Sequence, residues 1–193
     1  MKALQRYEKN LGKMLDAAKF LFLSEGYQNT SMDKVAAKAK VTKQTIYRYF
    51  PSKAELFKAV LMRLSPKGRD YGFGDGDVRE ELEAFARSFV ALHLTEERLG
   101  LFRLIISESP KVRELGKTFF EAAPSARKKS LSKYISETLK TNAPDKDADI
   151  FSAMLLYVRN SILMGISPIP DTHWIEAHCS YVTALFLSGR QLR

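Results

Sequence analysis

The sequence has a single cysteine, Cys179, among its 193 residues. One cysteine excludes an intrachain disulfide and favours a reducing compartment, so we expect a cytoplasmic protein. Long apolar runs are also missing: the longest, residues 150–169, is interrupted by Arg159, Asn160 and serines. Since a bilayer span requires about 20 consecutive apolar residues, we predict no contact with a membrane. Residues 1–10 are polar and basic, which argues against a signal peptide.

Groups that could support catalysis are equally scarce. His173 and His178 are five positions apart, which places them about 140° from each other around a helix. Adding Cys179 does not bring three ligands to one face, so we predict no metal site. The segment 72–77 contains three glycines but lacks the Lys-Ser/Thr of a P-loop and the spaced ligands of an EF-hand. With no nucleophile motif and no dinucleotide fingerprint, we predict a protein that is not an enzyme and has no cofactor.

What the sequence does contain is positive charge at one end. Residues 1–64 hold 13 Lys/Arg and 5 Asp/Glu, a net charge of +8, whereas the remaining residues hold 18 and 17, a net charge of +1. Positive charge concentrated in one segment attracts a polyanion to that part of the molecule. A basic, solvated surface is the alternative. We favour a nucleic-acid partner because the charge coincides with the motif described next.

Residues 30–58 predict two short helices joined by a tight turn, followed by a third helix. Thr30 with Asp33, and Ser52 with Glu55, match the Ser/Thr-x-x-acid pattern in which side chains satisfy the backbone donors of a helix start. The pattern is typical of a helix-turn-helix.

The middle helix, predicted from Thr42 to Phe50, carries groups suited to contact with DNA bases. Thr42 can cap it, while Ile46 and Phe50 face inward. The exposed positions hold cationic, amide and hydroxyl groups: Lys43, Gln44, Thr45, Tyr47 and Arg48. Such groups at the start of a short second helix are what a helix in the major groove needs. We predict that Lys43, Gln44, Thr45 and Tyr47 reach base edges.

Residues 14–58, roughly a quarter of the chain, resemble the N-terminal domain of the tetracycline-repressor-like (TetR/AcrR) transcriptional regulators. The matching stretches are Met14-Leu-Asp-Ala-Ala18, Phe22 to Ser31, Val35-Ala36, and Val41 to Leu56 with its Tyr47-Arg-Tyr-Phe-Pro-Ser-Lys53. So long an ordered pattern is specific to this family.

The resemblance implies further contacts with DNA. It places Tyr49 and Lys53 on phosphates, and the helix starts at Thr30–Ser31 and Thr42 offer backbone donors to phosphate. One position departs from the family, which usually has Gly before the Val of the turn where this chain has Lys40. We expect Lys40 to occupy the position where the family uses Gly. If it adopts the left-handed conformation there, the cost for a residue other than Gly is roughly 1–2 kcal/mol; an ordinary right-handed turn is the alternative.

The rest of the chain also predicts helices, giving an all-α protein of about nine helices. The three-helix head covers residues 1–51, a connecting helix covers 52–64, and residues 65–193 form a larger helical domain. We expect Gly26 to end the first helix, predicted over residues 7–24. In the larger domain we expect helix starts at Asp77, Thr95 and Asp171, and one long helix from Pro144 to about Gly165.

The last two long helices, about 145–165 and 171–188, are apolar on more than one side. A helix with two apolar faces must bury both, and an identical subunit under two-fold symmetry is the simplest partner for the second face. The resemblance implies the same arrangement, because family members dimerise through their C-terminal helices. A wholly internal core is the alternative interpretation.

The resemblance also implies that the larger domain binds a small-molecule effector. The stretch Leu101-Phe-Arg-Leu-Ile-Ile-Ser-Glu108 is similar to one found in a subgroup with this C-terminal domain. Candidate ligand-binding residues are aromatic and polar: Phe89, His93, Phe102, Tyr134, Tyr157 and Asn160. An aromatic core is the alternative for these side chains.

Together these features predict a transcriptional regulator, most often a repressor in this family. It would bind palindromic, double-stranded operator DNA as a homodimer and release it when a small molecule binds. The alternative is a constitutive or architectural DNA-binding protein whose second domain only dimerises.

Overall fold

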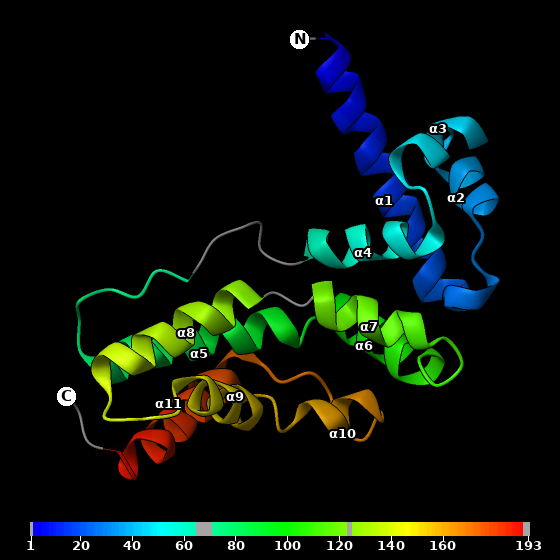
Figure 1. Cartoon of the computed structure of the whole chain (residues 1–193). Helices are drawn as coiled ribbons and strands as arrows, with labels where there is room; N and C mark the ends of the chain where they lie inside the picture. Colours follow the sequence, from blue (N-terminus) through cyan, green and yellow to red (C-terminus); the bar gives the residue numbers. More distant parts are fainter. Residues whose placement is uncertain (1, 65–70, 123–124, 191–193) are drawn as a thin grey trace. The chain divides into compact units, whose positions relative to one another are not determined.

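The computed structural model describes residues 2–64, 71–122 and 125–190, and within these ranges the chain forms eleven helices and no strand (Figure 1). The predicted all-α fold is confirmed. The chain divides into two compact units. We call Met1–Lys67 with Gly100–Ala123 the head unit, and Gly68–Leu99 with Pro124–Arg193 the second unit. The functional boundaries predicted at residues 51 and 64 remain predictions.

The head unit contains the helix-turn-helix and two helices from later in the chain. Its helices are α1 (Lys2–Asn29), α2 (Met32–Ala39), α3 (Lys43–Tyr49), α4 (Lys53–Leu64), α7 (Arg113–Ala122) and, from Gly100 onward, α6 (Glu96–Glu108). A single apolar core joins them, and its largest fully buried side chains include Phe22 of α1, Ile46 of α3 and Phe57 of α4. The rings of Phe22 and Phe57 meet edge to face, with centroids 5.2 Å apart. This core fixes the position of α3, the predicted recognition helix.

The second unit is a separate helical bundle. It consists of α5 (Val78–His93), α8 (Ser125–Thr138), α9 (Pro144–Leu155), α10 (Arg159–Leu163), α11 (Thr172–Ser188) and the first turn of α6. Helix α11 packs on α5 and α9, and α8 packs on α9. Phe85, Phe151 and Phe186 are buried where these helices meet.

The count of about nine helices was wrong. The single long helix predicted from Pro144 to about Gly165 is two helices, α9 and α10, because α9 ends at Leu155. There Leu156 N–H is shared between the carbonyls of Ser152 and Ala153, each 3.2 Å away, and Tyr157 N–H donates to the Met154 carbonyl. This tightening from four-residue to three-residue spacing ends an α-helix. No Gly or Pro stands at the break, so the sequence carries no signal for it.

The predicted helix caps are largely confirmed. Backbone N–H groups donate to the side chains of Thr42, Ser52, Asp77 and Asp171 at distances of 2.8–3.2 Å. The exception is α2, whose cap is Ser31 rather than Thr30, because the Lys34 N–H donates to the Ser31 hydroxyl at 3.2 Å.

Helix α1 extends further at both ends than predicted, and its interruption at Gly26 (φ 84°, ψ 168°) agrees with the expected role of that glycine. None of the helices in the described part of the chain combines the length and apolar character needed to cross a bilayer.

Candidate nucleic-acid interface

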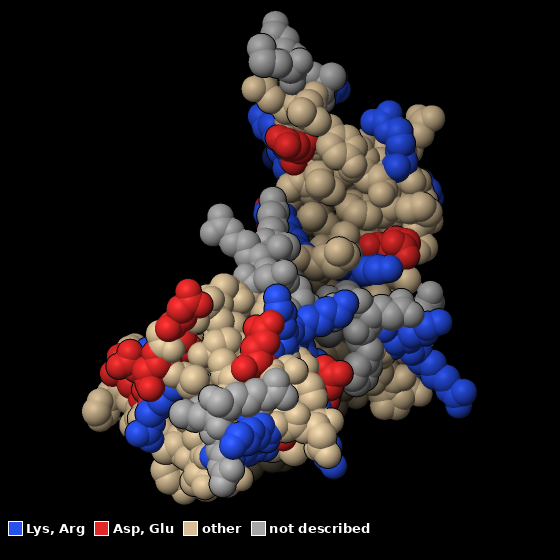
Figure 2. Space-filling model, turned by 60° about the vertical axis from the view of Figure 1, so that its left-hand side comes forward, with Lys and Arg blue, Asp and Glu red and all other residues tan. Residues whose placement is uncertain are grey.

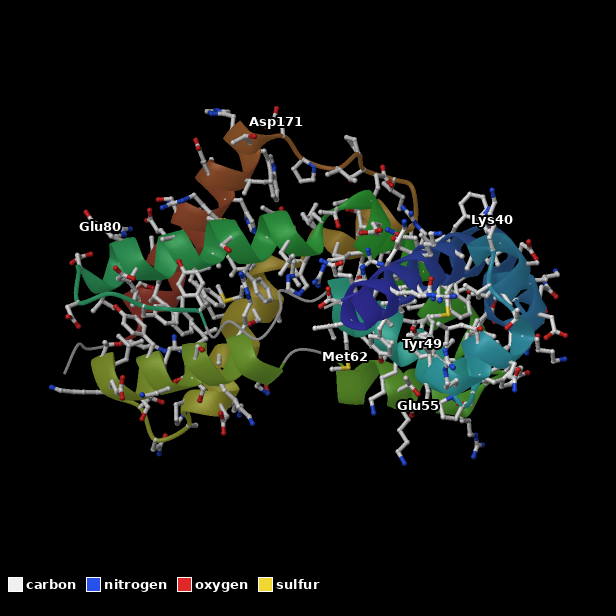
Figure 3. The ribbon with its side chains drawn as sticks, turned by 90° about the horizontal axis from the view of Figure 1, so that it is seen from above. Lys40, Tyr49, Glu55, Met62, Glu80 and Asp171 are labelled. Atoms are coloured by element: carbon white, nitrogen blue, oxygen red, sulfur yellow. The ribbon has the colours of Figure 1, made fainter. Side chains whose placement is uncertain are left out.

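The turn between α2 and α3 is stabilised by its own backbone. Lys40 adopts the left-handed conformation (φ 56°, ψ 43°), one of the two conformations that the sequence left open for this position. Its N–H donates to the Ala37 carbonyl at 3.1 Å, and the Val41 N–H donates to the Ala36 carbonyl at 3.0 Å. This pair of bonds is the Schellman motif that commonly ends a helix. Lys40 lies at the outer edge of the helix-turn-helix (Figure 3).

Helix α3 begins at Thr42, whose hydroxyl accepts the Thr45 N–H at 3.1 Å. Its inward face carries Ile46, which is fully buried. On the outward face Lys43, Gln44, Tyr47 and Arg48 are exposed, and Thr45 is half-buried. Six residues therefore present an ammonium, an amide, a phenol and a guanidinium to solvent. These groups can bond base edges and phosphates.

The charge on this face is partly paired. Lys43 Nζ lies 2.9 Å from a carboxylate oxygen of Asp33 on α2, and both side chains are well exposed. The hydrogen bond to Asp33 raises the pKa of Lys43, so its ammonium remains protonated. Figure 2 shows acidic side chains beside basic ones on the face of the molecule that it draws. DNA would therefore compete with Asp33 for Lys43, a partner that the sequence analysis missed.

Tyr49, the predicted phosphate contact at the end of α3, is held by α1. Its ring stacks on Tyr7 with centroids 4.5 Å apart, and its hydroxyl donates to the Tyr7 carbonyl at 3.4 Å. No sequence pattern indicated this contact with Tyr7. The stacking orients the phenol at the boundary of α1 and α3, where it is half-buried.

Two of the predicted DNA contacts have other partners in the head unit. Thr30 is 1% exposed, and its hydroxyl donates to the Gly26 carbonyl at 2.7 Å, so its side chain cannot reach DNA. Only its backbone remains a predicted contact. Lys53 Nζ donates to the carbonyls of Tyr27, Gln28 and Thr30 at 2.8, 3.2 and 3.0 Å. These three carbonyls match the three ammonium donors.

The neighbouring exposed residue Ser31 accepts a backbone N–H as the cap of α2. The structure thus groups seven predicted residues on the outer surface of α2 and α3: Ser31, Thr42, Lys43, Gln44, Thr45, Tyr47 and Arg48. Tyr49 lies at the edge of this set. Contact of each with DNA stays a prediction.

The predicted effector residues are less well grouped. Phe89 and His93 lie one turn apart on α5, with ring centroids 4.1 Å apart and the Phe89 carbonyl 2.8 Å from His93 Nδ1. Burial lowers the pKa of His93 to about 4; the carbonyl opposes this shift, whereas repulsion from Arg98, Arg127 and Arg159 adds to it. His93 is therefore neutral at pH 7.

Tyr134 belongs to an aromatic stack that reaches Phe89. Its ring lies 4.0 Å from that of Phe73, and the buried Phe85 ring lies 5.5 Å from both Phe73 and Phe89. Tyr134 and Phe73 also line a groove of about 510 Å³. This packing favours the aromatic-core interpretation for Phe89 and Tyr134, and ligand binding by either residue stays a prediction.

The remaining three candidates are dispersed. Tyr157 is 65% exposed, with the His178 ring 5.2 Å away, and Asn160 is also exposed. Phe102 belongs to the head unit, where its ring meets Phe119 edge on at 5.6 Å. Within either unit, the structure does not bring the six residues together as one site.

Comparison with known families agrees with this architecture. Residues 14–60 match the family described as "Bacterial regulatory proteins, tetR family". Residues 80–188, more than half of the chain, match "AefR-like transcriptional repressor, C-terminal domain".

Individual relatives extend the comparison. The HTH-type transcriptional repressor DrrR1 of Streptomyces coeruleorubidus is 37% identical over 84 residues, which cover 43% of this chain but only 31% of that protein. The HTH-type transcriptional regulator YvkB of Bacillus subtilis (strain 168) is 25% identical over 186 residues, covering 92% of this chain and 95% of that protein. The solved structure of the flavonoid-responsive regulator FrrA has 27% identity and a TM-score of 0.79, covering 95% of this chain and 98% of that one. The chain belongs to the TetR family of bacterial transcriptional regulators.

Proposed function

We propose that the protein is a repressor that binds palindromic operator DNA as a homodimer and releases it when a small molecule binds. The observation that carries this proposal is the presentation of Lys43, Gln44, Tyr47 and Arg48 on one exposed face of a short, capped helix. One such helix contacts one half-site. Tight binding therefore needs two helices spaced about 34–36 Å apart, which a two-fold dimer supplies.

Base contact is tested at Gln44, which combines an amide donor with an acceptor and lies exposed on α3. Gln44→Ala should weaken binding to a duplex selected from a random pool by roughly 1–3 kcal/mol, and leave binding to a scrambled duplex nearly unchanged. Asn142→Ala, which removes an exposed amide from the second unit, is the matched control. Equal losses on both duplexes would remove Gln44 from base contact.

Homodimerisation is supported by the surface of the last helices. Helix α11 buries Cys179, Val182 and Phe186 against its own unit, while Tyr181 and Leu185 face outward. Other large apolar side chains around α9 and α10 are also 41–72% exposed: Ile150, Tyr157, Met164 and Ile166. Large exposed apolar surfaces mark interaction sites in natural proteins. A second copy of the chain would cover this one.

The dimer is tested by light scattering. A Tyr181→Glu, Leu185→Glu double variant should sediment and scatter as a monomer, because burying two carboxylates in an apolar interface is costly. The monomer should lose most of its affinity for a palindromic duplex and retain that for a half-site. Leu4→Glu changes an equally exposed apolar residue of α1 and should remain dimeric. A Tyr181→Glu, Leu185→Glu protein that stays dimeric would rule out this surface.

An effector distinguishes the proposal from constitutive DNA binding. The positive charges of Arg98, Arg127 and Arg159 all help to lower the pKa of His93, at the end of α5. Arg127 also donates a hydrogen bond to the Ser88 hydroxyl at 3.2 Å. Positive charge concentrated there favours a ligand that carries a negative charge.

We would screen hydrophobic carboxylates against their primary amides, together with flavonoids because FrrA responds to them. The readout is displacement of the selected duplex by fluorescence anisotropy. Carboxylates that displace DNA better than their amides would support an anionic effector. Failure of every compound would favour the constitutive alternative.

A further inference from the structure

Helix α1 is broken at Gly26, and the break exposes backbone groups that need partners. Gly26 has φ 84° and ψ 168°, a combination that is essentially restricted to glycine. Residues 27–29 then form a separate helical turn before the Ser31 cap of α2. We call residues 26–31 the α1–α2 junction. The first N–H groups of a new turn have no partner within it.

Glu108, the last residue of α6, supplies those partners. Its two carboxylate oxygens accept the N–H groups of Tyr27 at 2.7 Å and Gln28 at 2.9 Å. Hydrogen bonds that involve an ionised group are about twice as strong as neutral ones. A Cβ added at Gly26 would lie 2.5 Å from a Glu108 oxygen, so the glycine also makes room for the carboxylate.

Lys53 of α4 completes the junction on its carbonyl side. Its ammonium donates to the carbonyls of Tyr27, Gln28 and Thr30 and lies 4.5 Å from the centre of the Tyr27 ring. The turn is therefore held by a carboxylate from α6 at its N–H end and an ammonium from α4 at its carbonyl end. Both charges lie far from the junction in sequence.

The same face of α6 contributes to the apolar core of the head unit. Leu101, Ile105 and Glu108 follow one another at helical spacing, and the first two are buried in the core that contains Phe22. At Gly100 an added Cβ would come within 3.0 Å of a side-chain methyl carbon of Leu23 of α1, so Leu23 lies directly against the backbone of α6 at this point. Helix α6 is continuous from Glu96, in the second unit, to Glu108, in the head unit.

We propose that Glu108 is the positioning residue through which α6 sets the placement of the helix-turn-helix. Its carboxylate fixes the α1–α2 junction, and the junction leads directly into α2 and α3. A movement of α6 would be transmitted to the recognition helix through two hydrogen bonds rather than through apolar contact alone. This inference rests on the proposed function, since it concerns how DNA recognition is controlled.

The test compares Glu108→Gln with Glu96→Gln, which removes the same charge from the exposed first turn of the same helix. An amide at position 108 keeps one acceptor and turns its NH₂ group toward a backbone donor. We expect amide hydrogen exchange at Tyr27 and Gln28 to quicken at least about tenfold in Glu108→Gln. We also expect the ratio of affinities for the selected and scrambled duplexes to fall about tenfold or more. Glu96→Gln should match the wild type in both measurements.

The affinity ratio separates positioning from simple stabilisation. Loss of folded protein lowers binding to both duplexes equally and leaves their ratio unchanged, whereas a displaced recognition helix lowers the ratio. An unchanged ratio in Glu108→Gln, with or without faster exchange, overturns the proposal. If Glu108→Gln does not fold, Glu108→Asp, which keeps the charge and shortens the reach, is judged by the same ratio. A wild-type protein that enriches no duplex would overturn the proposed function itself, and this inference with it.

Discussion

The two ends of α2 are stabilised in contrasting ways. At the end that leads to α3, Lys40 and Val41 bond the carbonyls of Ala37 and Ala36, so every partner lies within six residues. At the end that follows α1, the junction is held by Lys53 and by Glu108, whose partner Tyr27 lies 81 positions away. One end is bonded within neighbouring residues alone, whereas the other adds partners from two distant helices to its own Ser31 cap.

This difference indicates that α2 and α3 can stay fixed relative to each other while their placement in the head unit changes. The backbone hydrogen bonds of the α2–α3 turn involve no other element, so we expect the two helices to keep their mutual arrangement. The junction before α2 depends on α4 and α6, so the helix pair can change its placement when either helix moves. Variants at the two ends should therefore differ in the size and the kind of their effects.

The largest effect is expected at Gly26. Gly26→Ala forces a Cβ into a conformation suited only to glycine and against the Glu108 carboxylate, and should lower the free energy of unfolding by about 3 kcal/mol. Urea denaturation measures this loss. Gly12→Ala is the matched control, because its Cβ would meet nothing within 4 Å. Similar stability for Gly26→Ala and Gly12→Ala would mean that the junction adapts at little cost.

Lys53 tests the junction end of α2 directly, because the family resemblance and the structure predict different results for its substitution. The family resemblance predicts a phosphate contact, lost equally on operator and random DNA and with stability unchanged. The structure predicts that Lys53→Met leaves three carbonyls without their donor and lowers the free energy of unfolding by about 2 kcal/mol. Urea denaturation and salt-dependent DNA binding measure the two outcomes, with Lys58→Met on α4 as the control. Unchanged stability in Lys53→Met would return this residue to the phosphate contacts.

The distinction between local and distant hydrogen-bond partners also determines which features could be predicted from the sequence. The caps at Thr42, Ser52, Asp77 and Asp171 and the break at Gly26 depend on neighbouring residues, and all were predicted correctly. The conformation of Lys40 was left open, because Lys stands where a glycine would have indicated it. The partner of Glu108 could not be predicted, because no periodicity relates residue 108 to residue 27. Thr30 was misassigned as the cap because it matches the Ser/Thr-x-x-acid pattern with Asp33, whereas Ser31 has Lys34 at that spacing. In the structure Thr30 is buried and its hydroxyl donates to the Gly26 carbonyl, and Ser31 caps α2 instead.

In the second unit, His93 also combines a local hydrogen bond with burial that depends on distant residues. Its hydrogen bond to Phe89 is local, but its burial depends on the packing of the whole unit, and burial lowers the pKa to about 4. The unfolded chain binds a proton near pH 6.5 and the folded chain does not, so stability is full above pH 6.5 and falls as the pH drops towards 4.

Between pH 7 and 5, His93 should contribute a loss of roughly 2 kcal/mol in the free energy of unfolding. Urea denaturation across this range measures it. His93→Asn keeps a donor near the Phe89 carbonyl without the titration, and its stability should vary less with pH by the same amount. Parallel pH profiles for the two proteins would show that His93 is protonated in the folded state.

The smallest effect is expected at Lys40, at the local end of α2. Lys40→Gly relieves the left-handed strain but gives the unfolded chain more freedom, so it should stabilise the protein by up to about 1 kcal/mol. Lys40→Ala keeps the strain and removes the ammonium, which separates conformation from charge. Both variants should bind random DNA slightly less well than the wild type. Because the turn depends only on its own backbone, neither should change the ratio of operator to random affinity, in contrast to Glu108→Gln. A Lys40→Gly protein that melts below the wild type would show that this turn, too, depends on contacts beyond its own residues.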